Sequence, residues 1–226
     1  YNTAMGFQAL KTSVGGTYNV AIGNYAMRSH SEAASTYNVA VGSKVMYNIE
    51  TGTNNVVLGD SAMYGKTGTD NDENIAIGAS ALYTASGVTN TVAIGHGAAY
   101  NVTTGGNNTI IGAYAGDAVT TGQGNTIVGS SAGSAFDTEF YITAVGYEAM
   151  KDAVGDNYSV AVGMRAMADA DSTGGQEIAI GYQAGRYFGA GTSDSVVIGG
   201  SAGAGSSTTA FGGTSVVAIG GGAIQE

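Results

Sequence analysis

The stretch NVAIGNYAM at residues 19–27 decides the fold, because it returns along the chain with small changes. It reads NVAVGSKVM at 38–46, NVVLGDSAM at 55–63 and NIAIGASAL at 74–82. Self-similarity at a fixed period is typical of solenoids, in which each copy stacks on the one before it. The glycine of the phrase occurs thirteen times, at spacings of 17 to 21 residues: Gly6, Gly23, Gly42, Gly59, Gly78, Gly95, Gly112, Gly129, Gly146, Gly163, Gly181, Gly199 and Gly220.

The residues that precede each glycine predict one short strand per copy. Positions are numbered here from that glycine, so that −1 comes directly before it. Position −1 is always aliphatic or Met, position −3 is Val, Ile or Thr, and position −2 is Ala in nine copies. Such a pattern is typical of a strand, and a period near 17 leaves no room for a helix as well. We therefore predict an all-β fold: a parallel β-solenoid or β-roll of about 13 coils, forming one repeat domain over residues 1–226 of a longer chain.

The composition excludes several classes of function. The chain has 39 glycines, no proline and no cysteine, which excludes disulfides and Cys-type zinc sites. Its net charge is −10 with only seven Lys and Arg residues, which argues against nucleic acid as a partner. The sequence contains no run of about 18 apolar residues, so a membrane-spanning helix is not predicted.

The strands are apolar at every position, and this predicts self-association. Because strand side chains alternate between faces, we expect positions −3 and −1 to point into the coil and position −2 to point outward. No copy has a polar residue at −2, so we expect a second copy of the chain to cover that face, although an unseen second domain would also serve. An elongated homotrimer is the simplest closed assembly in which copies of the chain, arranged about a common axis, cover one another's outward faces. The predicted trimer seam contains Ala21, Ala40, Ala76, Ala93, Ala144, Ala161 and Ala179.

Four tyrosines lie five residues after the glycine in consecutive copies: Tyr47, Tyr64, Tyr83 and Tyr100. Stacked coils would place them about 4.8 Å apart. They are candidates for stacking on the sugar rings of a surface glycan. The favoured alternative is a self-stacking ladder that covers the coil edge.

Three other patterns have a simpler structural interpretation. The loop at 68–76 holds Asp70, Asp72 and Glu73, which are weak candidates for a hard cation, but the spacing is not that of an EF-hand and a solvated acidic loop is favoured. The histidines His30 and His96 have no partners of a triad or metal cluster, and we expect both at the surface. Asparagine at −4 predicts structural amide ladders in Asn2, Asn19, Asn38, Asn55, Asn74, Asn108 and Asn125.

The phrases NTAMGFQAL, NVAIGNYAM, NTIIGAYAG and NTIVGSSAG resemble the coil repeats of bacteriophage tail fibres. They also resemble the repeats in the β-roll heads of YadA-like trimeric autotransporter adhesins, whose repeats usually run near 14 residues. The resemblance covers essentially the whole chain, and the spacing of 17 to 21 residues is closer to the fibre family. Both families form trimers, which implies the same for this chain.

The resemblance implies a structural segment of a phage tail fibre: a rigid shaft or head on the virion that supports attachment to the host. The alternatives are an adhesin head on a bacterial surface and a polysaccharide-cleaving tailspike. We expect no enzymatic activity and no cofactor, because no position of the repeat keeps an acid for glycoside hydrolysis. The expected partners are copies of the chain itself and a host-surface glycan or protein, with neither nucleic acid nor a membrane among them.

Overall fold

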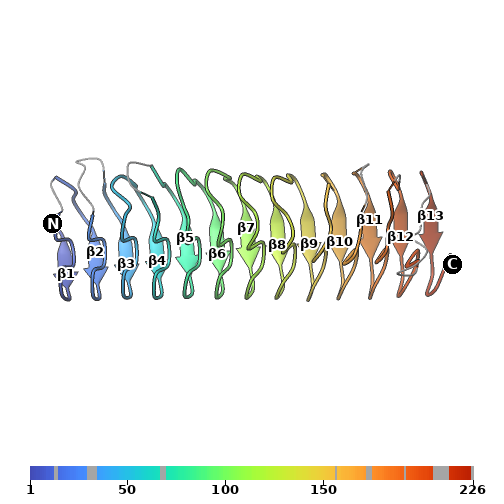
Figure 1. Ribbon diagram of the computed structural model, residues 1–226, viewed down its shortest axis with the longest axis horizontal. Coiled ribbons are helices and arrows are strands. Elements are labelled where there is room, and N and C mark those ends of the chain that lie inside the picture. Colours follow the sequence, from blue (N-terminus) through green and yellow to red (C-terminus); the bar gives the residue numbers. More distant parts are fainter. Residues whose placement is uncertain are drawn as a thin grey trace. The chain divides into compact units, whose positions relative to one another are not determined.

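The computed structural model describes residues 1–12, 15–29, 35–66, 70–155, 157–171, 175–190, 192–205 and 214–224. In these residues the chain forms strands of three residues each and no α-helix, which confirms the predicted β-solenoid (Figure 1). The strands are β1 (Thr3–Met5), β2 (Val20–Ile22), β3 (Val39–Val41), β4 (Val56–Leu58), β5 (Ile75–Ile77), β6 (Val92–Ile94), β7 (Thr109–Ile111), β8 (Thr126–Val128), β9 (Thr143–Val145), β10 (Val160–Val162), β11 (Ile178–Ile180), β12 (Val196–Ile198) and β13 (Val217–Ile219).

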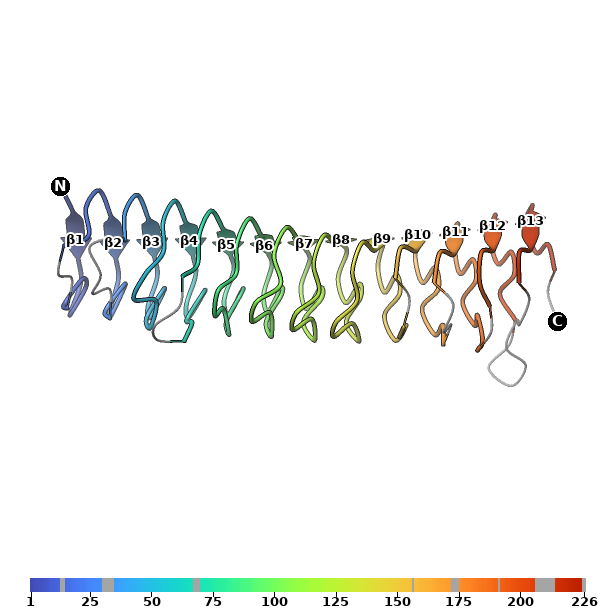
Figure 2. The same cartoon turned by 90° about the horizontal axis from the view of Figure 1, so that it is seen from above.

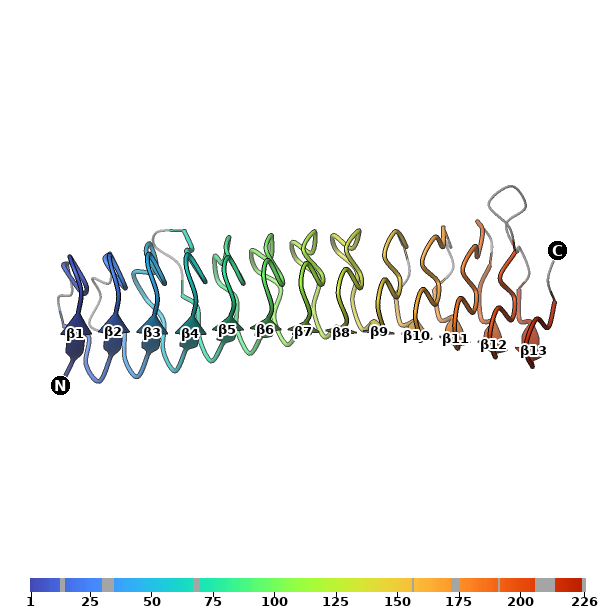
Figure 3. The same cartoon turned by 90° about the horizontal axis from the view of Figure 1, so that it is seen from below.

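The chain divides into two compact units built from the same coil. The first unit is Tyr1–Tyr114 and holds β1 to β7, and the second is Ala115–Glu226 and holds β8 to β13. Within each unit every strand pairs in parallel with the next, as Ala21 does with Ala40 and Ala161 with Ala179. In both units the strands lie along one side of the coils and the loops along the other (Figures 2 and 3). Equivalent positions are therefore neighbours in space, one coil apart.

The glycine of the repeat is required where the coil turns after its strand. Gly23 has a φ of +134°, and a Cβ added there would lie 2.2 Å from the carbonyl oxygen of Gly42. Gly129 repeats this in the second unit, with a φ of +140° and the same 2.2 Å from Gly146. Both the positive φ and the close approach of the backbone exclude a side chain.

The predicted orientation of the strands was wrong. Position −2 faces the interior of the coil: Ala21, Ala93 and Ala161 are fully buried within a single chain. Positions −3 and −1 face outward, and Ile75 and Ile77 are each 37% exposed. The same correction applies to every alanine of the predicted seam, all at 0% exposure: Ala21, Ala40, Ala76, Ala93, Ala144, Ala161 and Ala179.

The physical reason for this reversal is the narrow interior of the coil. The residue at −2 shares that space with those at +3, +4 and +7, of which Ala26, Met27 and Ile49 are examples with no exposed surface. A small residue fits such a space, whereas a branched residue fits the outer face. Alanine at −2 thus reflects close packing across one coil instead of contact between chains.

Within a coil, a large interior side chain at one position is matched by a small one at another. In the coil that follows β8, position +4 is Gly133 and position +7 is the fully buried Phe136. A Cβ on Gly133 would lie 2.7 Å from the Phe136 ring and 3.3 Å from Ile127 at −2. The next coil has the opposite pair, Met150 at +4 and Ala153 at +7, both fully buried. Each coil fills the same space with a different division of side-chain volume.

The predicted amide ladder is present in the interior. Asn55 Oδ1 accepts hydrogen bonds from the backbone N–H and the side-chain Nδ2 of Asn74, at 3.0 and 3.1 Å. Asn55 Nδ2 donates to Asn38 Oδ1 at 2.9 Å and to the carbonyl oxygen of Asn71 at 2.6 Å. The side chain is fully buried, so these bonds satisfy groups that water does not reach. The ladder ties each coil to the next and closes the corner of its own coil.

Candidate functional site

The outer face of the strands is the main candidate site. It is formed by positions −3 and −1, and every copy has Val, Ile, Leu, Met or Thr there. The most exposed of these in the middle of the first unit are Val56, Leu58, Ile75 and Ile77, at 37 to 38%. A sheet face open to water ordinarily carries polar or charged side chains. We call this surface of each unit the outer strand face.

Stacked tyrosines at position −5 border the outer strand face. In the first unit the Tyr18 ring stacks on Tyr1 at 5.2 Å and on Tyr37 at 5.0 Å between centroids. In the second unit Tyr141 stacks on Tyr158 at 5.5 Å. Sequence analysis did not single out these residues, although tyrosine recurs at −5 in five copies. They extend the exposed apolar surface beyond the strands.

A groove of about 470 Å³ lies on the outer strand face of the second unit. Its lining residues are Tyr158 and Val160 from one coil and Gln176 and Ile178 from the next. The groove has an apolar floor with one phenol and one amide at its edge. Val160 and Ile178 belong to the outer strand face at position −3, and Tyr158 and Gln176 belong to its border at position −5.

The tyrosines predicted as a glycan site stack on one another. The ring centroids are 5.0 Å apart for Tyr47 and Tyr64, 5.2 Å for Tyr64 and Tyr83, and 4.9 Å for Tyr83 and Tyr100, with planes within 15° of parallel. Tyr64 and Tyr83 therefore each have a tyrosine on both faces. Burial first, and then the neighbouring Tyr100 and Tyr64, raise the pKa of Tyr83. The structure shows the self-stacking ladder; glycan binding stays a hypothesis.

An arginine that sequence analysis did not single out closes one end of this tyrosine stack. The Arg28 guanidinium lies 5.3 Å from the centre of the Tyr47 ring and donates a hydrogen bond of 2.8 Å to the Tyr47 hydroxyl. It also lies 5.8 Å from the centre of the Tyr25 ring, and its Nε donates to Gln8 at 3.2 Å. A cation over an aromatic face is stabilised by the charge distribution of the ring. Arg28 therefore belongs to the packing of three successive coils.

The acidic loop at 68–76 contributes a contact between two coils. Asp72 Oδ1 accepts hydrogen bonds from the backbone N–H and hydroxyl of Thr53, at 2.7 and 2.9 Å, and so links two coils. Asp70 and Glu73 are exposed. No group of three or more His, Cys, Asp or Glu side chains with metal-binding geometry occurs among the described residues. Asp72 therefore serves as a link between coils, and a hard cation at Asp70, Asp72 and Glu73 stays an untested hypothesis.

Of the two histidines, only His96 lies in the described part of the chain. His96 is exposed, as predicted, and its ring packs edge-on against Tyr114 at 5.0 Å. His30 lies outside the described residues. His96 therefore contributes to the packing of adjacent coils.

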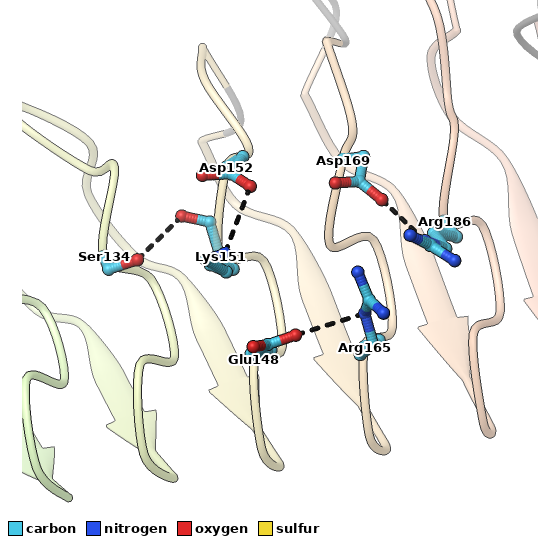
Figure 4. Close-up of polar contacts among 7 residues, drawn as sticks. All are labelled: Ser134, Glu148, Lys151, Asp152, Arg165, Asp169 and Arg186. Atoms are coloured by element: carbon cyan, nitrogen blue, oxygen red, sulfur yellow. Dashed lines mark hydrogen bonds and ion pairs between the residues drawn. The ribbon is translucent and has the colours of Figure 1, made fainter. Parts of the chain in front are cut away.

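Two ion pairs connect successive coils of the second unit (Figure 4). Arg165 Nε lies 3.2 Å from a carboxylate oxygen of Glu148, and Arg186 Nε lies 2.6 Å from one of Asp169. Each pair spans 17 residues, one period of the repeat, so the spacing of opposite charges was visible in the sequence. Surface pairs of this kind contribute about 0 to 1 kcal/mol each. They support the stack without forming a binding site.

No protein-family model matches the chain, and no curated protein matches it either. Among the described residues there is also no helix that could span a membrane. The outer strand face and its tyrosine border thus stand as the candidate site on their own geometry.

Proposed function

We propose that the chain is a structural segment of a phage tail fibre, a homotrimeric shaft or head that supports attachment to a host surface. The observation that carries this proposal is the uncharged, aliphatic outer strand face. A face of this kind is stabilised when another surface removes it from water. The interior alanines have no part in the proposed interface.

A second copy of the same chain is the partner that fits best. The outer strand face repeats its aliphatic side chains once per coil, so a matching partner needs the same repeat along its length. Identical chains meet this condition, and rotation about a common axis closes the assembly without leaving an open face. Three copies is the number that the resemblance to fibre and adhesin repeats implies.

The fibre is favoured over the adhesin head by the spacing of 17 to 21 residues and by the wording of phrases such as GYQAG at 181–185. The function of the segment is then mechanical. In-register coils, the amide ladder and the tyrosine stack all connect neighbouring coils, and none requires a bound cofactor. The attachment region itself lies either in the loops or in a neighbouring part of the fibre.

Two measurements test the proposal. Light scattering coupled to gel filtration should give the purified chain a mass of three times 22.3 kDa. The open reading frame that contains the chain should continue into a C-terminal self-cleaving chaperone. The neighbouring genes should encode other tail proteins. A monomer in solution would contradict the trimer. A C-terminal membrane anchor in the same reading frame would support the adhesin head instead of the tail fibre. Degradation of a purified polysaccharide would promote the tailspike instead.

A further inference from the structure

Glu177 occupies a position of the interior ladder that is neutral in the other copies. Position −4 is Asn in seven copies, and in the coil of β11 it is Glu177, which is fully buried. The preceding and following coils have Ser159 and Ser195 at the same position, also fully buried. Glu177 is therefore an ionisable group in a row of amides and hydroxyls.

The contacts of Glu177 satisfy only half of its carboxyl group. The Ser159 hydroxyl donates to Glu177 Oε2 at 2.8 Å, and the same hydroxyl oxygen accepts the Glu177 backbone N–H at 3.1 Å. Glu177 Oε1 is buried and has no hydrogen-bond partner among the described residues. A carboxylate needs several donors when it is removed from water, whereas a neutral carboxylic acid needs fewer.

The charged groups near Glu177 also disfavour its ionised form. The preceding coil contributes the neutral Ser159, and the following coil contributes the carboxylate of Asp194. No ion pair of Glu177 occurs within the described ranges. Burial first raises the pKa of Glu177; the hydrogen bonds from Ser159 and its own backbone lower it, and Asp194 raises it again.

We propose that Glu177 makes the second unit sensitive to pH: the closed stack holds it as a neutral acid, and its ionisation loosens the coil between β10 and β11. Because the folded state binds this proton more tightly than the unfolded chain does, the stabilisation is complete below the unfolded pKa. It is lost as the pH rises through the folded pKa. The coil of β11 is then the point at which the unit first opens as the pH rises.

The test compares thermal unfolding of the whole chain with that of Glu177→Gln from pH 4 to pH 9. The glutamine has the same shape but no charge, so its midpoint should exceed that of the parent increasingly as the pH rises. The expected difference is roughly 3 to 5 °C for each pH unit between the unfolded and folded pKa values. A difference between parent and variant that does not change with pH would overturn the proposal.

Hydrogen exchange gives the location of the opening. Backbone amides of Ile178–Ile180 should lose protection in the parent as the pH rises, after correction for the intrinsic rate, and keep it in Glu177→Gln. Equal loss at Thr126–Val128 in β8 would contradict a local effect. If Glu177→Gln does not fold, Glu177→Asn is measured in its place, because seven other copies carry Asn at this position.

Glu139 provides a matched control in the same unit. It is 9% exposed, but its carboxylate accepts the backbone N–H groups of Asp137, Thr138 and Gly155 at 2.6, 3.0 and 3.2 Å. Three backbone N–H groups therefore point at its carboxyl oxygens, and the side-chain NH₂ group of a glutamine could not accept from them. Glu139→Gln should lower the midpoint at neutral pH, the opposite of Glu177→Gln, and the same sign for both variants would count against the proposal.

Discussion

Phe136 occupies the space that a side chain on Gly133 would need. The two residues lie in one coil, and a Cβ built on Gly133 would come within 2.7 Å of the Phe136 ring. One coil further along, Met150 and Ala153 stand at the same two positions, and Met150 has a φ of 52° where Gly133 has 56°. The backbone at this position therefore accepts a side chain, and the Phe136 ring is the nearest group that excludes one, with Ile127 next at 3.3 Å.

The core of this coil should accept an exchange of volumes. Phe136→Ala alone should destabilise the chain by about 3 to 5 kcal/mol through the cavity it leaves. Gly133→Met alone should also destabilise it, because the added side chain meets the ring. The double variant should recover most of the loss, as measured by denaturant unfolding. If its free energy of unfolding falls by the sum of the two single losses or more, the two positions do not share one space.

Charges on the outer strand face should separate the chains without unfolding the coil. Ile75→Glu and Ile77→Glu should reduce the mass in solution from trimer to monomer while the circular dichroism of the parent is retained. Ala76→Glu, between them, places an unpaired charge in the interior and should unfold the coil itself. Thr104→Glu in an exposed loop is the control and should change neither property. A trimer that survives both outer substitutions would show that this face is not the interface.

Loss of one rung of the amide ladder should be costly. Asn55→Leu leaves the buried N–H of Asn74 and the carbonyl of Asn71 without their partner. Each unsatisfied group costs about 1 to 3 kcal/mol, so chemical denaturation should show a loss of about 2 to 6 kcal/mol. Asn24 at the surface is the control, and Asn24→Leu should change stability by less than about 0.5 kcal/mol. Comparable losses in the two variants would mean that the ladder contributes little.

The tyrosine stack distinguishes structural from ligand-binding roles. Tyr64 touches a tyrosine ring on each side, so Tyr64→Ala should lower the free energy of unfolding by about 1 to 3 kcal/mol beyond the loss of buried area, while Tyr64→Phe keeps both ring contacts. Denaturant unfolding of the two variants measures the difference. Loss of binding to a glycan array in Tyr64→Ala with unchanged stability would favour the sugar-binding interpretation.

The repeat itself could be predicted from sequence, because its period and its glycine depend on the backbone alone. Which strand face lies inside could not be predicted from alternation, because both faces are apolar. A signal was present, however, in the way positions change together. Three of the four copies with a larger residue at −2 have glycine at +4, which indicates that the two positions share the interior: Ile110 with Gly116, Ile127 with Gly133 and Val197 with Gly203.

The predicted seam was assigned to the wrong residues, because the alanines at −2 lie inside the coil. A strand apolar on both faces still calls for a covering partner once the faces are exchanged, and that partner stays a proposal. Alanine at −2 was interpreted as close contact between chains, whereas the interior of one thin coil requires the same small residue. Glu177 was visible as an exception in the asparagine position, but its missing hydrogen-bond partner depends on three-dimensional contacts that no spacing reveals.

In-register pairing within each unit also bears on how such a gene changes. Because Val20 pairs with Val39 as Val39 pairs with Val56, each coil presents to its successor the surface that it receives from its predecessor. Unequal recombination that duplicates or deletes one period would then add or remove a coil and leave the remaining contacts of the same type. The number of coils would then change by whole repeats. Related genes should differ in length by multiples of one repeat far more often than by part of a repeat.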